Sequence, residues 1–357
     1  MIKYLGSKRL LIPGIEAVMN SLPFKGSVID LFSGTSRVGL SMKQLGWKVL
    51  LNDWNQYARV ISTAHVVCDE DRSKEVHELI QLLETASPID GWFTETYCRK
   101  SRYFTPENGI RIEGIREFIE TLDLDDELKC VAICSLMEAA DRVDSTVGVQ
   151  MAYLKQWSKR SLQTLKLRPP ALVKQSEFGK ASAHCMEAQE AASKLIADVA
   201  YLDPPYNQHK YIGNYHVWQT LVQWDQPEVY GIACKRVECR EKRSDFNSKP
   251  GIQGAMNRLI ENLQCEIKII SFSNEGYLPR TDMESLLLDH GKLQVLSRAH
   301  DRYVGAKIGI HAPSGKKVGQ VSHLKNTEFL YVLGEVDLSS GICEEAGWKM
   351  ESPLQTG

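Results

Sequence analysis

The sequence predicts an α/β fold in which an open, doubly wound sheet carries a mainly helical insertion. Three apolar runs, residues 27–32, 48–53 and 198–203, have the composition of buried parallel strands, and a loop and a helical pattern follow each of them. Between the second and third runs, residues 62–181 show helical periodicity and no convincing strand. Strands that alternate with helices indicate a doubly wound sheet, and an insertion of this length would fold as a lobe of its own.

The later segments extend this pattern. Residues 266–273 predict a fourth strand, and residues 292–299 and 328–336 predict a hairpin whose strands are joined by a long basic loop. We therefore expect a discontinuous main domain of residues 1–61 and 182–337, an insertion of residues 62–181, and a loosely held tail of residues 338–357. Helices are expected at residues 72–86, 114–122, 127–143 and 254–263.

Charge is unevenly distributed along the chain. The net charge of −2 over 357 residues argues against a polyanionic partner for the protein as a whole. However, residues 145–176 contain no Asp or Glu, and Asp301 is the one acid in residues 298–325. Two lysine-rich loops in solvent would explain both runs. A protein that holds nucleic acid on one face is the other explanation, and we favour it.

Composition also bears on location. Pro13, Gly14 and Glu16 interrupt the apolar N-terminal run, so we expect no signal peptide, and no apolar stretch approaches the roughly 20 residues that span a bilayer. The 9 cysteines are scattered without a C-x-x-C pair, and Cys130 and Cys134 lie in an apolar helical pattern that favours core thiols over zinc ligands. We expect a cytoplasmic protein with no membrane segment and no metal.

Two strand ends predict a nucleoside site. The first strand ends near Asp30 and Phe32, and Gly34 in the turn that follows lets the backbone approach a ligand closely. Asp53 ends the next strand, where a carboxylate can accept hydrogen bonds from both ribose hydroxyls; a helix N-cap is the alternative role. Together these features favour a nucleoside cofactor over the first two strands.

The third strand ends in the tetrapeptide Asp203-Pro204-Pro205-Tyr206. The prolines remove two N–H donors, stiffen the turn and leave the Pro204 carbonyl free beside the Asp203 carboxylate. Two neighbouring acceptors can grip both protons of an exocyclic amine, which makes its lone pair available for attack. The Tyr206 ring offers a face on which a flipped base can stack. A rigid loop with a capping acid is the alternative.

The order of these motifs resembles that of the adenine-N6-specific DNA methyltransferases of the alpha group, the DNA adenine methylase-like family. In that family an N-terminal cofactor motif, an F-x-G loop, a target-recognition insertion and D-P-P-Y follow one another. The corresponding segments here are residues 3–8, 30–36, 62–181 and 203–206. Residues 270–276 are similar to the strand and turn that follow D-P-P-Y in the family. The resemblance implies a Rossmann-like S-adenosylmethionine-dependent methyltransferase sheet with a target-recognition lobe.

The resemblance also implies roles for single residues. Asp203 and Tyr206 would handle the target adenine, with Asp203 also bordering the cofactor. Ser36 stands where the family loop often has a second glycine; we expect the serine to keep the turn and cap the helix. Glu187 takes the position of an adenine-edge contact, but we favour the alternative that it is a surface glutamate. The implied S-adenosylmethionine contacts are Tyr4, Lys8, Asp30, Phe32, Ser33, Gly34, Thr35, Asp53 and Asp203.

The remaining basic and aromatic segments are expected to hold double-stranded DNA. An enzyme that modifies a base must extrude it from the stack, and residues 206–220 have the aromatic and polar composition expected beside such a base. Packing at a helix start is the alternative for Tyr211, Tyr215 and Trp218. Residues 152–170 predict a phosphate-contacting helix and its exit, and residues 304–323 a second basic arm. The candidate DNA contacts are Lys155, Lys159, Arg160, Lys166, His209, Lys210, Asn214, Lys307, Lys316 and Lys317.

These observations predict a site-specific DNA methyltransferase that modifies adenine N6, with a restriction endonuclease as its functional partner in a bacterial or phage-encoded restriction–modification system. The same fold could instead methylate cytosine N4, an RNA base or a protein side-chain amide. Asp at the first position of the tetrapeptide favours adenine, because related cytosine-N4 enzymes usually have Ser there and the glutamine methylators Asn. An inactive DNA-binding regulator is a further alternative, although a pure binder needs no paired amine acceptors.

Overall fold

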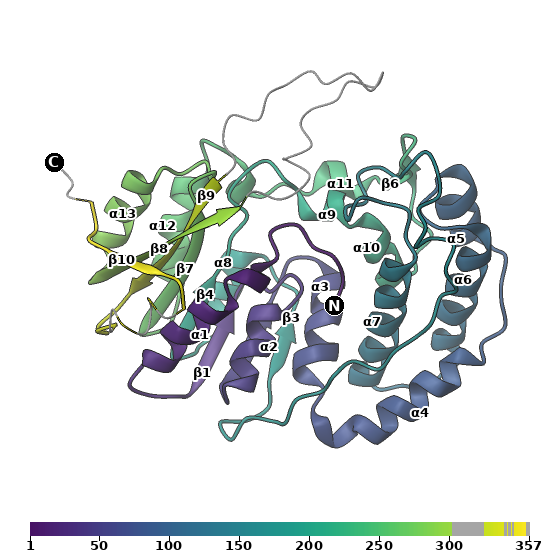
Figure 1. Cartoon of the computed structure of the whole chain (residues 1–357), viewed down its shortest axis with the longest axis horizontal. Helices are drawn as coiled ribbons and strands as arrows, with labels where there is room; N and C mark the ends of the chain where they lie inside the picture. The colour runs from purple at the N-terminus through teal and green to yellow at the C-terminus, as the bar shows by residue number, and fades with distance from the viewer. Residues whose placement is uncertain (302–324, 339–340, 342–343, 345, 355–357) are drawn as a thin grey trace.

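A central sheet organises the molecule (Figure 1). The computed structural model describes residues 1–301, 325–338, 341, 344 and 346–354. Within these residues the sheet has eight strands in the order β10-β8-β9-β7-β4-β1-β2-β3. The strands are β1 (Ser27–Asp30), β2 (Lys48–Asn52), β3 (Ser182–His184), β4 (Val199–Leu202), β7 (Ile267–Ser273), β8 (Leu293–Asp301), β9 (Lys325–Leu333) and β10 (Lys349–Glu351).

The sheet is mostly parallel, as predicted. β1 pairs in parallel with β2 and β4, and the parallel array continues to β3 on one side and β7 on the other. β9 pairs antiparallel with both β7 and β8, which confirms the predicted hairpin. All six predicted strands are present, whereas β3 and β10 were not predicted.

Side chains of the central strands alternate between two cores. Val28 in β1 and Val199 in β4 point to one core, whereas their neighbours Ile29 and Ala200 point to the other. All four are fully buried, which explains why these strands are continuous apolar runs. The first core is covered by α1 (Ile12–Ser21) and α2 (Arg37–Gln44), and the second by α8 (Ala188–Lys194), α12 (Ile252–Asn262) and α13 (Arg280–Leu288).

A third core lies in a helical lobe beside the sheet (Figure 1). This core takes side chains from α10 as well as from the helices of the predicted insertion. Since α10 follows β4 in the chain, the lobe is not built from residues 62–181 alone, and the predicted domain boundaries stay a proposal. The lobe helices are α3 (Gln56–Ser62), α4 (Ser73–Glu84), α6 (Pro106–Thr121), α7 (Asp126–Arg142) and α10 (His216–Gln223).

The helix predicted within residues 152–170 is wrong, because the structure has no helix there. Side chains from elsewhere bind the carbonyls that a helix would have used. Asn108 Nδ2 donates to the Ser161 and Gln163 carbonyls, each at 3.0 Å. Arg160 itself turns back to the carbonyls of Asp144 and Thr146, at 2.8 and 2.7 Å. The predicted helix is therefore an irregular segment held by tertiary hydrogen bonds.

The loosely held tail is a second correction. β10 pairs antiparallel with β8, Met350 facing Leu296. Trp348, just before this strand, is 2% exposed and lies against Gly14 of α1. A strand of three residues leaves little signal in the sequence, and burial of the indole ring is what holds it.

The remaining elements are short. β5 (Val229–Tyr230) and β6 (Lys235–Arg236) form a small antiparallel ribbon. No helix in the described part of the chain has the length and apolar character that crossing a membrane requires. The short helices are η1 (Lys8–Leu10), η2 (Thr63–Val67), η3 (Glu70–Arg72), α5 (Trp92–Thr94), η4 (Glu95–Lys100), α9 (Tyr211–Asn214), α11 (Glu238–Glu241) and η5 (Asp245–Asn247).

Candidate functional site

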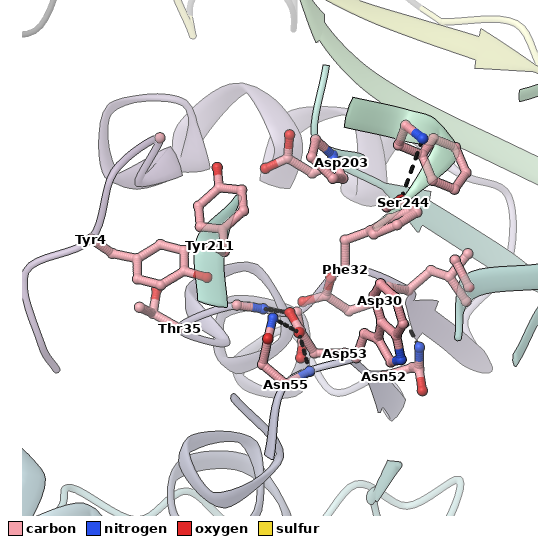
Figure 2. Close-up of a pocket in the computed structure, with 18 of the residues that line it drawn as sticks. Tyr4, Asp30, Phe32, Thr35, Asn52, Asp53, Asn55, Asp203, Tyr211 and Ser244 are labelled. Atoms are coloured by element: carbon pink, nitrogen blue, oxygen red, sulfur yellow. Dashed lines mark hydrogen bonds between the residues drawn. The ribbon is translucent and has the colours of Figure 1, made fainter. Parts of the chain in front are cut away.

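A pocket opens where β1, β2 and β4 end, and we call it the strand-end pocket (Figure 2). Its cavity is about 1070 Å³, with the open mouth included. This is the edge at which open α/β sheets bind ligands. Every residue that the resemblance assigned to the cofactor lines the pocket: Tyr4, Lys8, Asp30, Phe32, Ser33, Gly34, Thr35, Asp53 and Asp203.

The loop after β1 forms the floor of this pocket. Gly34 has φ +50°, and a Cβ at this position would lie 3.1 Å from the Tyr4 ring. Ser36 also has a left-handed backbone, with φ 59°, which explains why related loops have glycine there. The expected capping role of Ser36 is wrong: its side chain makes no cap hydrogen bond to α2, and its hydroxyl bonds the Ser62 hydroxyl at 2.6 Å.

Asp53 ties this loop to the end of β2. One carboxylate oxygen accepts the Gly34 N–H at 3.0 Å, and the other accepts the backbone and side-chain N–H groups of Asn55, at 2.8 and 2.9 Å. Burial raises the pKa of Asp53, although these donors oppose the shift. The N-cap of the following helix is Asn55, so the alternative role of Asp53 as that cap does not apply.

Asp203 projects into the pocket from the end of β4, and Lys8 meets it from η1. Lys8 Nζ lies 3.0 Å from Asp203 Oδ1 and 3.7 Å from Glu328 Oε2. Burial raises the pKa of Asp203 to about 6, although Lys8 opposes the shift. Burial also disfavours the Lys8 ammonium, but the two carboxylates outweigh this effect and raise the pKa of Lys8. The pocket therefore contains a shielded ion pair.

The tetrapeptide is fixed from behind by the turn after β7. The Tyr277 N–H donates to the Tyr206 carbonyl at 2.8 Å, and the Tyr206 ring lies 5.3 Å from that of Phe272. Pro205 lines the pocket, and Pro204 is buried. Within residues 1–301 and 325–338, no backbone N–H donates to the Pro204 carbonyl. Asp203 and Pro204 thus offer neighbouring oxygen acceptors on a braced turn.

Asp30 lies between the pocket and α2. It is 1% exposed, and its Oδ2 accepts the Gly39 N–H at 3.1 Å. Burial and the neighbouring charge of Asp203 raise the pKa of Asp30 to about 8, although the Gly39 N–H opposes the shift. Burial thus favours the protonated, uncharged form of the Asp30 carboxyl.

One wall of the pocket was missed by the sequence analysis. Residues 242–247 reach it from beyond α11, and the Phe246 ring lies 5.4 Å from that of Phe32 in an edge-on arrangement. Asn247 also donates to the Asn207 carbonyl at 2.7 Å, which steadies the chain just after the tetrapeptide. No motif marks this segment, and only its tertiary position could have identified it.

The aromatic residues after the tetrapeptide pack inside the protein. Tyr215 and Trp218 are each 1% exposed, which confirms the packing alternative for both. Tyr211 stacks on Tyr4 with ring centroids 5.1 Å apart, beside the pocket (Figure 2). Glu187 lines the pocket and also caps α8 through the Gln189 N–H at 2.7 Å. A purely surface role for Glu187 is therefore excluded.

The predicted DNA contacts divide by exposure. Lys155, Lys159, Lys166 and His209 are exposed, and Lys210 is half-buried at the pocket. The Arg160 side chain is partly exposed and pairs with Asp144, whereas Asn214 is 2% exposed, so of these two only Arg160 has surface to offer a partner. Lys307, Lys316 and Lys317 lie outside the described residues.

Among the described residues, one group of possible metal ligands comes together, and it lies away from the pocket. His65, Cys134 and Glu138 have their ligand atoms within 4.8 Å of one another. His65 Nε2 lies 2.8 Å from Glu138 Oε1. Burial would raise the pKa of Glu138, but His65 and the ammonium of Met1 outweigh burial and lower this pKa to about 2. Hydrogen bonding and charge pairing account for this group.

Comparison with known proteins gives a family and several relatives. The family model for the D12 class N6 adenine-specific DNA methyltransferases matches residues 4–274. The chain is 31% identical over 310 residues to the Type II methyltransferase M.FokI of Planomicrobium okeanokoites, an alignment that covers 81% of this chain and 47% of that protein.

Two further relatives are similar to the same extent. The chain is 30% identical over 307 residues to the modification methylase StsI of Streptococcus sanguinis, which covers 80% of this chain and 46% of StsI. It is 28% identical over 319 residues to the Type II methyltransferase M.NlaIII of Neisseria lactamica, which covers 86% of this chain and 93% of M.NlaIII. The chain thus spans about half the length of M.FokI and of StsI.

Proposed function

The chain belongs to the family of D12 class N6 adenine-specific DNA methyltransferases, and from this membership we propose that it transfers a methyl group from S-adenosylmethionine to the N6 amine of an adenine in double-stranded DNA. One observation carries the proposal: Asp203 lines a pocket suited to a nucleoside, and the carbonyl of the next residue, Pro204, accepts no backbone N–H among the described residues. A methyl donor and a gripped amine would then meet at one edge of the sheet.

The strand-end pocket fits S-adenosylmethionine. The Asp53 carboxylate retains lone pairs for the ribose hydroxyls, since N–H groups of Gly34 and Asn55 occupy only part of its acceptor capacity. Phe32 and Phe246 supply an apolar wall for the adenine ring, and Glu187 an acceptor for its amine. A Cβ at Gly34 would lie 3.1 Å from the Tyr4 ring, so a side chain there would require that ring to shift. When bound, the cofactor supplies an electrophilic methyl group.

The chain's own residues would prepare the amine. Asp203 and the Pro204 carbonyl each accept one N–H proton, which draws the nitrogen toward tetrahedral geometry and exposes its lone pair. As the nitrogen gains a methyl group it becomes cationic, and the Asp203 carboxylate can take the proton that is then lost. Tyr206, braced by Phe272, offers its ring to the flipped base, a contact worth about 1–3 kcal/mol.

The rest of the proposal concerns partners and setting. The helical lobe would recognise the target sequence, and exposed lysines such as Lys155 and Lys159 would bind phosphates. The relatives are named as Type II methyltransferases and modification methylases, which supports a role in modification paired with a restriction endonuclease. The sources of these relatives are bacteria, which supports a cytoplasmic setting in a bacterial cell.

Digestion of reacted DNA to nucleosides tests the proposal. Full-length protein, methyl-labelled S-adenosylmethionine and genomic duplex DNA should yield labelled N6-methyladenine. Asp203→Ala should lower the rate on the order of a hundredfold or more, because one of the two amine acceptors is lost. Asp282→Asn, the loss of an exposed acid on α13, is the matched control and should match wild type.

The other substrates are outcomes of the same experiment. Label on cytosine, RNA or protein alone would replace the adenine proposal with that substrate. DNA binding without label on any nucleoside, in a protein that retains cofactor affinity by calorimetry, would favour the inactive regulator.

A further inference from the structure

A carboxylate from the C-terminal hairpin lies beside Lys8, a lysine that lines the strand-end pocket. β9 runs antiparallel to β7, so its first residues lie where the parallel strands end; Glu328 pairs there with Ser273. Glu328 is 8% exposed, a rare environment for a carboxylate. It follows the last residue matched by the family model, residue 274, so the family comparison assigns it no role.

Glu328 faces the lysine that also holds Asp203. Lys8 Nζ is 3.7 Å from Glu328 Oε2 and 3.0 Å from Asp203 Oδ1, and the Lys8 side chain is 7% exposed. Glu328 Oε2 has no hydrogen-bond partner among the described residues, although it is buried. A buried carboxylate oxygen without a donor is destabilising, so its position beside an ammonium points to a function rather than to stability.

The proposed grip on the amine makes a second partner for Lys8 necessary. An Asp203 oxygen that is bound to Lys8 is a weaker acceptor for an amine proton. If Asp203 turned to the amine with no other carboxylate nearby, the buried Lys8 ammonium would lose its only close counter-charge, which is costly. A small rotation of the lysine would instead close its distance to Glu328.

We propose that Glu328 is a positioning residue for methyl transfer: it takes over the Lys8 ammonium, so that Asp203 is free to accept the target amine. This inference rests on the proposed function. It also accounts for the charge of the site, because two carboxylates and one ammonium leave a net negative charge that stabilises the amine as it becomes cationic.

Besides Lys8 and Glu328, four ionisable side chains face Asp203, and the test leaves all four unsubstituted. They are Asp30, Tyr201, Tyr206 and Tyr211.

The variant Glu328→Gln keeps the shape of the side chain and removes its charge. It should lower the pKa of Asp203 by about one unit, for two reasons that act in the same direction: a negative neighbour is lost, and Lys8 pairs with Asp203 alone. Carboxyl-labelled aspartate observed by NMR in the cofactor-free protein measures this pKa, with the Asp203 signal identified by its loss in Asp203→Asn.

Kinetics give the second readout. The acid limb of the wild-type rate profile should fall below about pH 6, where Asp203 becomes protonated. In Glu328→Gln this limb should move to lower pH by about one unit. The maximal rate should drop on the order of tenfold, because Lys8 now competes with the amine for Asp203, while DNA affinity stays within about twofold.

Two further variants make the comparison specific. Glu328→Asp keeps the charge at a greater distance and should lower the pKa of Asp203 by less than Glu328→Gln; it also serves if Glu328→Gln fails to fold. Glu275→Gln removes an exposed carboxylate from the same edge, one that bonds Asn326, and should leave the Asp203 pKa nearly unchanged.

The outcomes separate the two proposals. If wild type methylates DNA but neither Glu328 variant shifts the Asp203 titration or the acid limb, the role of Glu328 is overturned and the methyltransferase proposal stands. If wild type methylates nothing, the proposed function fails, and the NMR titration still decides whether Glu328 and Lys8 are coupled to Asp203.

Discussion

Asp30 is a carboxyl group whose protonated form the fold favours by burial. Burial raises its pKa to about 8, with a contribution from Asp203. A raised pKa means that the folded protein binds this proton more tightly than the unfolded chain, whose aspartates titrate near pH 3.9. Stability from this group is therefore complete below about pH 4 and is lost as the pH rises toward 8.

We predict that Asp30→Asn reduces the pH dependence of stability. The free energy of unfolding of wild type should fall between pH 5 and pH 8 more than that of Asp30→Asn, because the amide cannot ionise and its oxygen can still accept the Gly39 N–H. Urea unfolding at the two pH values measures both differences.

Asp198→Asn is the control at the other end of the same strands. Hydrogen bonds from Ser27 hold the pKa of Asp198 below its usual value, so its loss should destabilise the protein equally at pH 5 and pH 8. Parallel pH curves for wild type and Asp30→Asn would contradict the prediction.

At the scale of elements, β10 shows how one side chain can dock a short strand. Trp348 is 2% exposed, and a Cβ on Gly14 of α1 would overlap its indole ring. The observed position of the Trp348 ring therefore requires a residue without a side chain at position 14.

We predict that Trp348→Ala lowers the free energy of unfolding by about 3–5 kcal/mol, the usual loss for a large buried aromatic side chain. Gly14→Ala should also destabilise the protein, but the double variant should be less destabilised than the sum, because the clash is relieved once the indole is gone. Denaturant unfolding of the three variants measures this coupling. As a control, Lys349→Ala changes an exposed residue of β10 and should stay within about 0.5 kcal/mol of wild type. If the effects of Trp348→Ala and Gly14→Ala were additive, the proposed contact between the two residues would be contradicted.

At the scale of the whole molecule, the question is which surface meets DNA. The lysines of residues 145–176 lie on an irregular segment of the lobe, and Arg160 fixes that segment by binding Asp144. The arginine should thus act through structure, and the exposed lysines through phosphate contacts.

We predict that Lys155→Gln combined with Lys159→Gln weakens binding to any duplex and reduces the salt dependence, with a change in slope of about 0.9 for each lysine that contacts a phosphate. Fluorescence anisotropy over a series of salt concentrations measures the slope, and cofactor affinity should be unchanged. Lys25→Gln, an exposed lysine just before β1, is the control at the opposite edge of the sheet. Equal slopes for the double variant and wild type would remove these lysines from the interface.

The sequence by itself determined the sheet and the ligand-binding edge. Apolar runs identified β1, β2, β4 and β7, and the polar residues at their ends were placed correctly because parallel strands must end at one edge. The prediction for the tetrapeptide also agrees with the structure: no backbone N–H of the described residues donates to the Pro204 carbonyl. These features depend on neighbours in the chain, so they can be read from it.

Only the tertiary structure decided the rest, since it depends on partners distant in sequence. Hydrogen bonds of Arg160 and Asn108 hold an irregular segment where a helix was predicted. Trp348 packs the predicted tail against α1. Phe246 completes the pocket, and Glu328 joins Lys8 because β9 returns antiparallel to β7. The free energy of a buried charge or ring depends on the groups that contact it. Those groups come from distant parts of the chain, so local sequence patterns do not reveal them.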